Sequence, residues 1–205
     1  MEIVLHNVKP VYMSESEVSG SDIYMQQTVC FRQDKCYMIC AKSGHGKTSL
    51  LNFIYGTSTL YDGEITVTQA PPSPRSAFIS YMFQDLCLFP ELTAMENVLI
   101  KNNLTGFKNA DEIENMLDAL FLKEKRDQPL RTLSLGQQQR VAVVRALCQP
   151  FSFILLDEPF SHIDSQTAKV AASLICKEAE RQKAGIIITA LDTTDLFQFD
   201  SLMQL

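Results

Sequence analysis

The sequence predicts an α/β fold in which a mainly parallel sheet with flanking helices is interrupted by a helical insertion. Short apolar runs alternate with helical stretches at the start of the chain and again near its end. Between Asp85 and about Leu133 the strand signals stop. We therefore expect one domain over residues 1–205, with an α/β core at 1–84 and 146–205 and a helical subdomain at 85–145.

In the first half of the chain, apolar runs predict strands at residues 2–5, 23–31, 36–40, 63–68 and 77–83. A helix is predicted at 47–55, where Leu50, Leu51 and Ile54 recur at helical spacing. The segment QAPPSPRS separates the last two strands, and its three prolines exclude regular pairing there.

Helical spacing defines the insertion. Helices are predicted at 93–100 and 109–122, and the second presents Ile113, Met116 and Leu117 on one face. The strand–helix rhythm then returns with a buried strand at 151–156, a helix at 165–182 and a strand at 185–189.

Composition narrows the classes of function. The chain is 46% hydrophobic and 20% charged, with a net charge of −6, which argues against nonspecific nucleic-acid binding. Phosphate binding is compatible with this charge, because local amides and one lysine can hold it. The six cysteines form no CxxC pair and are expected to stay reduced. Without a signal peptide or a span of roughly 20 apolar residues, the chain is expected to be soluble and cytoplasmic.

A glycine-rich segment, AKSGHGKTS at 41–49, joins a predicted strand to a predicted helix. Backbone N–H groups in such a turn point at one spot, where the helix dipole adds positive potential. We expect Lys47 to bind β- and γ-phosphates and Thr48 to coordinate Mg²⁺. Ala41 replaces the glycine of the strict pattern, which is tolerable if its φ is negative. Taken alone, a chance glycine-rich turn with a surface lysine is the alternative.

Two carboxylates end the apolar run FILLDEP at 153–159. A buried strand would deliver them to the carboxyl edge of the sheet, where ligands of α/β proteins bind. There Asp157 would hold Mg²⁺, directly or through water, and Glu158 would polarise the attacking water as a general base. Acidic capping of a helix start before Pro159 is the alternative, and this segment alone leaves it open.

A serine and a glycine open a third segment, LSLGQQQR at 133–140. A helix beginning there offers a second N-terminus that can bind an anion. Simple N-capping by Ser134 is the common alternative.

Four segments in order resemble the ATP-binding subunits of ABC transporters: AKSGHGKTS, FQDLCLFPELTAMENV at 83–98, LSLGQQQRVAVVRAL at 133–147, and FILLDEPFSHID at 153–164. The resemblance covers nearly the whole chain, and four ordered motifs are far more specific than one. It implies a P-loop NTPase core with an N-terminal antiparallel β portion, an inserted helical subdomain of ABC ATPase type, and the cofactors ATP and Mg²⁺.

The resemblance also assigns roles to single residues. The phosphate-binding loop is Ser43, Gly44, His45, Gly46, Lys47, Thr48 and Ser49. Metal-side residues are Thr48, Gln84 and Asp157, and the catalytic residues are Glu158 with Gln84, which senses Mg²⁺ and water. Signature residues Ser134, Gly136 and Gln137 contact the γ-phosphate of the opposite subunit. Asp164 lies in the loop that crosses between subunits, and Tyr12 stacks on adenine unless it is an ordinary exposed tyrosine.

These roles imply an assembly. The signature helix lies away from its own glycine-rich loop, so it completes a site only on another subunit. We expect an ATP-bound homodimer, or a pair with a similar subunit, that docks on an integral-membrane permease at the cytoplasmic face of the membrane. Leu86, Leu88 and Phe89 lie where the family presents a docking groove, and subdomain core is the alternative for each of them.

Two departures from the family pattern affect the expected chemistry. Leu135 replaces the first glycine of LSGGQ and would crowd the nucleotide interface unless the backbone turns it outward. Related proteins carry a histidine just past the last core strand, where Ala190 and Leu191 cannot donate a side-chain hydrogen bond. His162, in the intersubunit loop, is more simply explained as a solvated residue than as a substitute. With Glu158 intact, slow hydrolysis is expected.

Two other classes of function remain open. One is an ATP-gated regulatory or structural module with weak hydrolysis, which the two departures favour. The other is a nucleic-acid-associated ABC ATPase, but such proteins usually carry large insertions or duplicated cores that this short acidic chain lacks.

Overall fold

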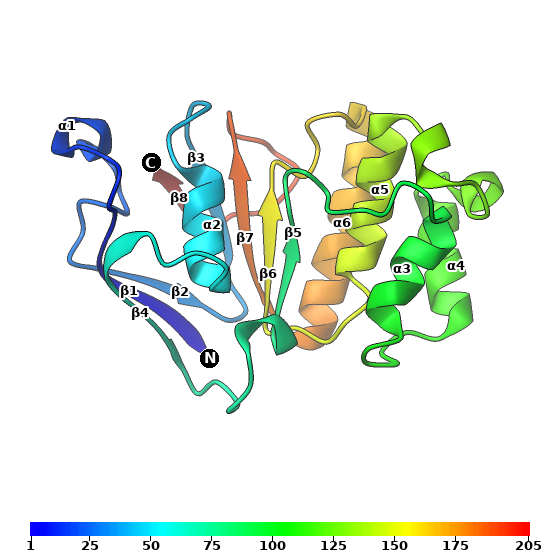
Figure 1. The fold of residues 1–205 in the computed structure, drawn as a ribbon, viewed down its shortest axis with the longest axis horizontal. Helices are drawn as coiled ribbons and strands as arrows, with labels where there is room; N and C mark the ends of the chain where they lie inside the picture. The colour runs from blue at the N-terminus through cyan, green and yellow to red at the C-terminus, as the bar shows by residue number, and fades with distance from the viewer.

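Two β-sheets with helices on their faces make up the structure, a computed structural model that describes residues 1–205 (Figure 1). The larger sheet is parallel, in the order β5-β6-β7-β3-β8. Its strands are β3 (Cys36–Cys40), β5 (Ile79–Met82), β6 (Phe153–Asp157), β7 (Gly185–Ala190) and β8 (Ser201–Gln204). The smaller sheet is antiparallel, in the order β2-β1-β4, with β1 (Glu2–Pro10), β2 (Thr28–Arg32) and β4 (Tyr61–Thr68). The predicted α/β fold class, with its N-terminal antiparallel portion, is therefore confirmed.

Alternation along the buried strands produces two apolar layers. In β6, Ile154 and Leu156 pack with the long helices α5 (Leu135–Ala146) and α6 (Ser165–Gln182). Phe153 and Leu155, on the opposite face, pack with α2 (Lys47–Tyr55) and the antiparallel sheet. Because successive side chains of a strand point to opposite faces, one apolar run serves both layers. The carboxyl end of β6 is thereby fixed from both sides.

The insertion supplies the helices at one end of the molecule (Figure 1). It contains α3 (Ala94–Asn102) and α4 (Ala110–Ala119), whose first turns are capped by the side chains of Thr93 and Asn109. Three-residue 3₁₀ turns (Lys123–Lys125 and Leu130–Thr132) follow before α5. The apolar residues of these helices join the same cluster as the sheet. The proposed subdomain boundary at 85–145 therefore stays a prediction.

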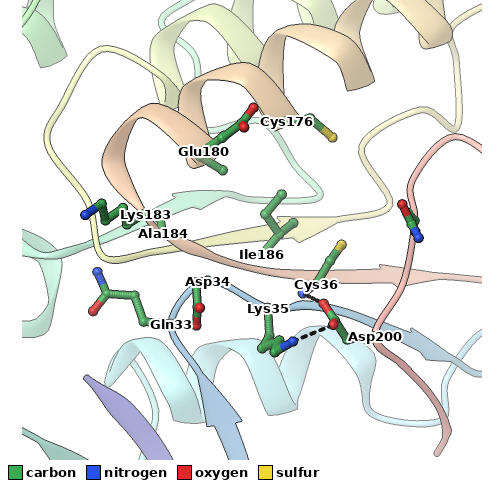
Figure 2. A pocket seen from close by; sticks show the side chains of 12 residues that line it. Gln33, Asp34, Lys35, Cys36, Cys176, Glu180, Lys183, Ala184, Ile186 and Asp200 are labelled. Atoms are coloured by element: carbon green, nitrogen blue, oxygen red, sulfur yellow. Dashed lines mark hydrogen bonds and ion pairs between the residues drawn. The ribbon is translucent and has the colours of Figure 1, made fainter.

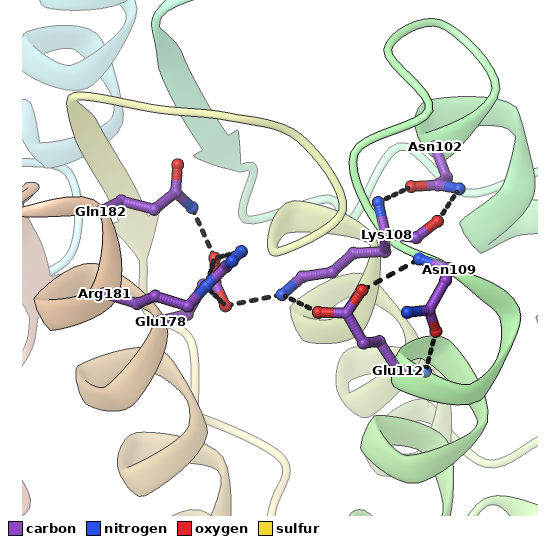
Figure 3. A network of polar contacts seen from close by, with 7 residues as sticks. All are labelled: Asn102, Lys108, Asn109, Glu112, Glu178, Arg181 and Gln182. Atoms are coloured by element: carbon purple, nitrogen blue, oxygen red, sulfur yellow. Dashed lines mark hydrogen bonds and ion pairs between the residues drawn. The ribbon is translucent and has the colours of Figure 1, made fainter.

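A buried lysine anchors the insertion to the core (Figure 3). Lys108, in the loop between α3 and α4, places Nζ 2.7 Å from Glu178 Oε2 on α6 and 3.3 Å from Glu112 Oε1. The side chain of Asn102 holds the Lys108 backbone through bonds to its N–H and its carbonyl, both 2.9 Å long. Arg181 and Gln182 also donate to Glu178, so the buried carboxylate is satisfied on several sides.

The structure corrects the predicted strand at 23–31. The strand in this region is Thr28–Arg32, paired with β1 from His6 to Glu2. Before it, the Ser21 hydroxyl accepts hydrogen bonds from the N–H groups of Ile23 and Tyr24, which folds this apolar stretch into a turn.

Two elements were not predicted, the short helix α1 (Glu15–Val18) and the edge strand β8. A short 3₁₀ turn (Arg75–Ala77) also precedes β5. None of the helices combines the length and the apolar character needed to cross a bilayer.

Candidate nucleotide site

The loop between β3 and α2 forms an open, glycine-containing turn. Gly44 and Gly46 have φ values of +82° and +87°, and a Cβ on Gly46 would lie 2.8 Å from Met13 Cε. The positive φ values favour glycine at both positions, whereas the Met13 contact can be relieved by rotation of that flexible side chain. Ala41 is not among the residues with positive φ, so the departure at this position is accommodated.

The amino end of α2 differs from those of the other helices of nine or more residues. α3, α4, α5 and α6 are each capped by a side-chain oxygen, whereas no side chain caps α2. The N–H groups of its first turn have no intrahelical acceptor. The helix dipole adds positive potential at the same place, which suits this end to a phosphate.

Lys47 crosses this loop with a buried side chain. Its Nζ donates to the carbonyl oxygens of Ala41 at 2.7 Å and Lys42 at 3.2 Å. Glu158 Oε1 lies 3.1 Å from the same nitrogen, with both side chains largely buried. The loop carbonyls thus already fix the Lys47 side chain. Binding a ligand would therefore cost little additional side-chain entropy.

Three oxygens converge beside Lys47. Thr48 Oγ1 lies 2.6 Å from Asp157 Oδ2 and 3.0 Å from Gln84 Oε1. A hydroxyl carries one proton, so it cannot donate fully to both acceptors. Thr189 donates to Asp157 Oδ1 at 2.6 Å and fixes the carboxylate from behind. Burial raises the pKa of Asp157, although the hydrogen bonds from Thr189 and Thr48 oppose this.

This donor set fits Mg²⁺. Hydroxyl, amide and carboxylate oxygens are its preferred protein ligands, and Mg²⁺ is usually completed by waters and substrate phosphates. The chain has no group of three His, Cys, Asp or Glu side chains suited to hold a metal without such help. Thr48, Gln84 and Asp157 therefore fit a cation delivered together with a phosphate ligand.

Glu158 occupies an unusual backbone conformation. Its φ is +48°, in the left-handed region that costs non-glycine residues free energy. The Glu158 N–H donates to the Thr189 carbonyl at 3.0 Å, which ties the residue to the end of β7. The side chain is thereby directed toward Lys47, away from the regular path of the strand.

A pocket of about 180 Å³ collects most of the predicted site. It is lined by Tyr12, Met13, Ser43, Gly44, Gly46, Lys47, Thr48, Ser49, Gln84 and Glu158. Asp157 lies behind Thr48 and is buried. The exposed ring of Tyr12 is held through its hydroxyl, which donates to Ser49 Oγ. His45 does not line the pocket and contacts the Ser43 carbonyl.

The signature residues lie outside this pocket. Ser134 and Gln137 form a reciprocal capping box, in which the Gln137 N–H donates to Ser134 Oγ at 3.3 Å and the Ser134 N–H donates to Gln137 Oε1 at 2.9 Å. A Cβ on Gly136 would lie 2.3 Å from the His162 carbonyl oxygen. Leu135 is half-exposed at the first position of α5. Within one chain, therefore, the signature and the glycine-rich loop do not meet.

Ala190 and Leu191, at and just after the end of β7, have no polar side chain. They line a mainly apolar pocket of about 210 Å³ that also includes Glu158, Leu196 and the hydroxyl-bearing Ser161 and Thr194. His162 Nδ1 lies 2.8 Å from Ser161 Oγ, within the loop that follows Glu158.

Three residues next to the site were not singled out from the sequence. Met13 lines the pocket, Thr189 holds Asp157, and Gln139 on α5 contacts the segment after β6. Thr189 directly follows an apolar run in the sequence, as Asp157 does, and this pattern could have identified it. Met13 and Gln139 reach their partners only through tertiary contacts, for which the sequence holds no pattern.

A larger groove, about 810 Å³, lies at the opposite edge of the parallel sheet (Figure 2). It is found at the amino ends of β3, β7 and β8, whereas α/β ligands bind at the carboxyl ends. Among its polar groups, Asp200 accepts from Lys35 Nζ and from the Cys36 N–H, each at 2.9 Å. Size therefore does not identify the functional site.

The sequence of this chain is similar to those of known proteins. The sequence model of the family described as ABC transporter matches residues 24–161. The chain is 32% identical over 191 residues to the ABC transporter ATP-binding protein YclH of Bacillus subtilis, spanning 88% of this chain and 83% of that protein. It is 30% identical over 212 residues to the glucose import ATP-binding protein GlcV of Saccharolobus solfataricus, spanning 96% of this chain but 58% of that protein.

Solved structures agree with the sequence relatives. The dimeric structure of MJ0796, a bacterial ABC transporter cassette, superposes with a TM-score of 0.72 at 25% identity over 93% of this chain and 88% of that one. A dimeric post-hydrolysis state of MJ0796 bound to ADP and phosphate gives 0.70.

Proposed function

Because this chain belongs to the ABC transporter family of ATP-binding proteins, we propose that it binds ATP with Mg²⁺, closes as a dimer around the nucleotide and hydrolyses ATP slowly. The observation that carries the proposal is the convergence of Lys47, the Thr48–Asp157–Gln84 oxygens and Glu158 at the uncapped start of α2. Residues suited to bind the phosphate, the cation and the attacking water therefore lie next to one another.

The chain's own residues would bind the nucleotide as follows. The N–H groups of the loop and the Lys47 ammonium bind phosphate oxygens, and Ser43 to Ser49 supply the cradle. The exposed ring of Tyr12 beside Ser49 offers a flat apolar surface for a base. Bound Mg²⁺, held by Thr48, Gln84 and Asp157, supplies charge neutralisation on the phosphates.

Glu158 is the general base of the proposed reaction. Its carboxylate orients a water and accepts its proton as that water attacks phosphorus, and ADP and phosphate leave. Lys47 stabilises the negative charge that develops on the phosphate oxygens. Ala190 and Leu191 offer no side-chain donor, so one charge-stabilising contact is lost. Removing one such donor typically lowers kcat by roughly 10²-fold.

Dimerisation completes the site. Ser134, Gly136 and Gln137 lie outside the pocket of their own chain, which supports a role across a subunit interface. The partner is a second copy or a similar subunit. We expect membrane attachment through a permease, with Leu86, Leu88 and Phe89 as candidate docking residues; Leu86 is buried here and Phe89 is half-exposed. Because its side chain is buried, Leu86 is a poorer candidate for docking than Phe89.

Light scattering of Glu158→Gln tests the dimer. With ATP and Mg²⁺ the mass should rise from 23.1 kDa toward twice that value, and ADP should leave it unchanged. A mass that stays monomeric at saturating ATP contradicts the proposal.

A second candidate is an ATP-gated regulatory module, favoured by the apolar end of β7 and the half-exposed Leu135. A single-turnover assay with Glu158→Gln as the blank separates the two. Phosphate release above the blank supports the hydrolase, and release equal to the blank supports the module.

A further inference from the structure

The helix that opens with the signature also contacts the segment that carries the proposed general base. Gln139, on the second turn of α5, is buried with only 3% of its surface exposed. Its Nε2 donates to the Glu158 carbonyl at 3.0 Å and to Ser161 Oγ at 3.1 Å. Its Oε1 accepts from the His162 N–H at 3.0 Å. One side-chain amide therefore binds both ends of the segment 158–162.

This segment needs external support. Glu158 has a left-handed backbone, which costs non-glycine residues on the order of 1–3 kcal/mol and persists only where the surroundings enforce it. The Glu158 N–H is already used by the Thr189 carbonyl on β7. Gln139 takes the carbonyl on the other side of the same residue, so Glu158 is held from both of its backbone polar groups.

The surface of α5 is shaped to receive the segment. Gly136 lies one turn before Gln139 and leaves no room for a Cβ, because the His162 carbonyl oxygen would be 2.3 Å away. The close approach at Gly136 brings the His162 N–H within reach of the Gln139 amide. Helix α5 and the segment 158–162 are therefore closely packed, with the buried Gln139 amide between them.

We propose that Gln139 is a positioning residue that sets the direction of the Glu158 carboxylate and ties the 161–162 turn to α5. Its effect on catalysis rests on the proposed role of Glu158 as general base. Through this amide, a displacement of the signature helix moves the backbone of Glu158 in the same subunit. The signature and the general base of one chain are thus mechanically joined.

The alternative is that Gln139 only stabilises the fold, as a buried amide with its hydrogen bonds satisfied. The neighbouring Gln138 provides a matched control. Gln138 donates from Nε2 to the carbonyls of Leu133 at 2.9 Å and Leu130 at 3.1 Å. It has the same side chain, lies on the same helix and also binds backbone carbonyls. Its acceptors lie before α5, away from Glu158.

Hydrogen–deuterium exchange tests the positioning without requiring hydrolysis. In Gln139→Met, which keeps the side-chain volume, the His162 amide should exchange at least tenfold faster than in the wild type. In Gln138→Met it should exchange at the wild-type rate. In Gln139→Glu the acceptor for His162 remains, so its amide should stay protected. Equal His162 exchange in wild type and Gln139→Met overturns the proposal.

Steady-state kinetics and ATP affinity test the consequence. Gln139→Met and Gln139→Glu should lower kcat at least tenfold and leave the Kd for ATP within twofold, because neither removes a phosphate ligand. Gln138→Met should keep kcat. An equal loss of kcat in the Gln138 and Gln139 variants assigns Gln139 a structural role only and contradicts the proposal. If the wild type binds no ATP, the proposed function fails, and the exchange experiment alone decides on the positioning.

Discussion

Lys47 and Glu158 face each other as an ion pair, with Nζ 3.1 Å from Oε1 in a largely buried setting. The residue proposed to bind phosphate and the residue proposed to activate water are therefore in direct contact. A phosphate that reaches Lys47 must share it with this carboxylate or displace it. Binding and catalysis are opposed at this point, because the negative charge needed for proton abstraction repels the substrate.

Neutralising the carboxylate should separate the two effects. In Glu158→Gln, Lys47 loses its competing anion, so ATP should bind several-fold more tightly, equivalent to about 1 kcal/mol. Hydrolysis should fall to the rate measured without protein, because an amide accepts no proton. Calorimetric titration with ATP and Mg²⁺ measures the affinity. Weaker binding by Glu158→Gln than by the wild type would show that the ion pair does not compete with phosphate.

The buried carboxylate of Asp157 should cost stability in the absence of ligand. Its pKa is raised by burial, so the charged form is disfavoured in the folded state. Asp157→Asn should therefore raise the ligand-free Tm by a few degrees at neutral pH, while Mg²⁺-dependent stabilisation by ATP is lost. Because the folded pKa is raised, the gain over wild type should shrink as the pH is lowered toward that pKa. A Tm below wild type at pH 7 contradicts this account.

The Lys108 anchor should dominate the attachment of the α3–α4 loop. Lys108 is one of two cations that pair with the buried Glu178, and Arg181 still compensates part of the carboxylate charge after its loss, so we expect a cost of about 1–3 kcal/mol. Lys108→Ala should lower the free energy of unfolding by this amount in denaturant titrations. Lys123, in an exposed ion pair with Asp118, is the control, and Lys123→Ala should change stability by less than about 0.5 kcal/mol. Equal losses of stability in Lys108→Ala and Lys123→Ala would contradict the anchoring role of Lys108.

Acid should destabilise the fold through its paired carboxylates. Burial alone would raise the pKa of Glu178, but hydrogen bonds from Arg181 and Lys108 outweigh it, and the pKa lies below its ordinary value of 4.5. Backbone hydrogen bonds at helix starts lower the pKa of Glu112 and Asp164 in the same direction.

Groups with depressed folded-state pKa values stabilise the fold at neutral pH, and this contribution is lost as the pH falls through those values. Asp157, whose pKa is raised, acts in the opposite sense but is a single group. Tm should therefore decline progressively from about pH 5 downwards. Glu178→Gln should lower Tm at pH 7 and make the decline of Tm with falling pH less steep. If Tm of the variant declines as steeply as that of the wild type, Glu178 does not contribute to acid destabilisation.

Local sequence signals predicted much of the fold and most of the pocket. The predicted helix 47–55 coincides with α2, because a glycine-rich loop precedes it and Gly56, in a left-handed conformation, ends it. The apolar runs before Asp157 and Thr189 predicted the central strands, whose carboxyl ends place the site.

What the sequence left out depends on distant contacts. The run at 23–31 looks like one strand, yet Ser21 turns its first part away from the sheet. β8 is an edge strand whose side chains are alternately half-buried and exposed, too short for a periodic signal. Gln139 reads as one of three consecutive glutamines, and only the packing of α5 on the segment after β6 distinguishes it from Gln138.

The affinity of the Lys47→Ala variant for ATP shows whether the glycine-rich loop is the nucleotide site. If this loop binds the triphosphate, the substitution should weaken binding at least 100-fold, because it removes a buried, charge-assisted contact. Lys42→Ala, which removes an exposed ammonium from the same loop, should bind ATP within twofold of the wild type. Wild-type affinity in Lys47→Ala would contradict the account.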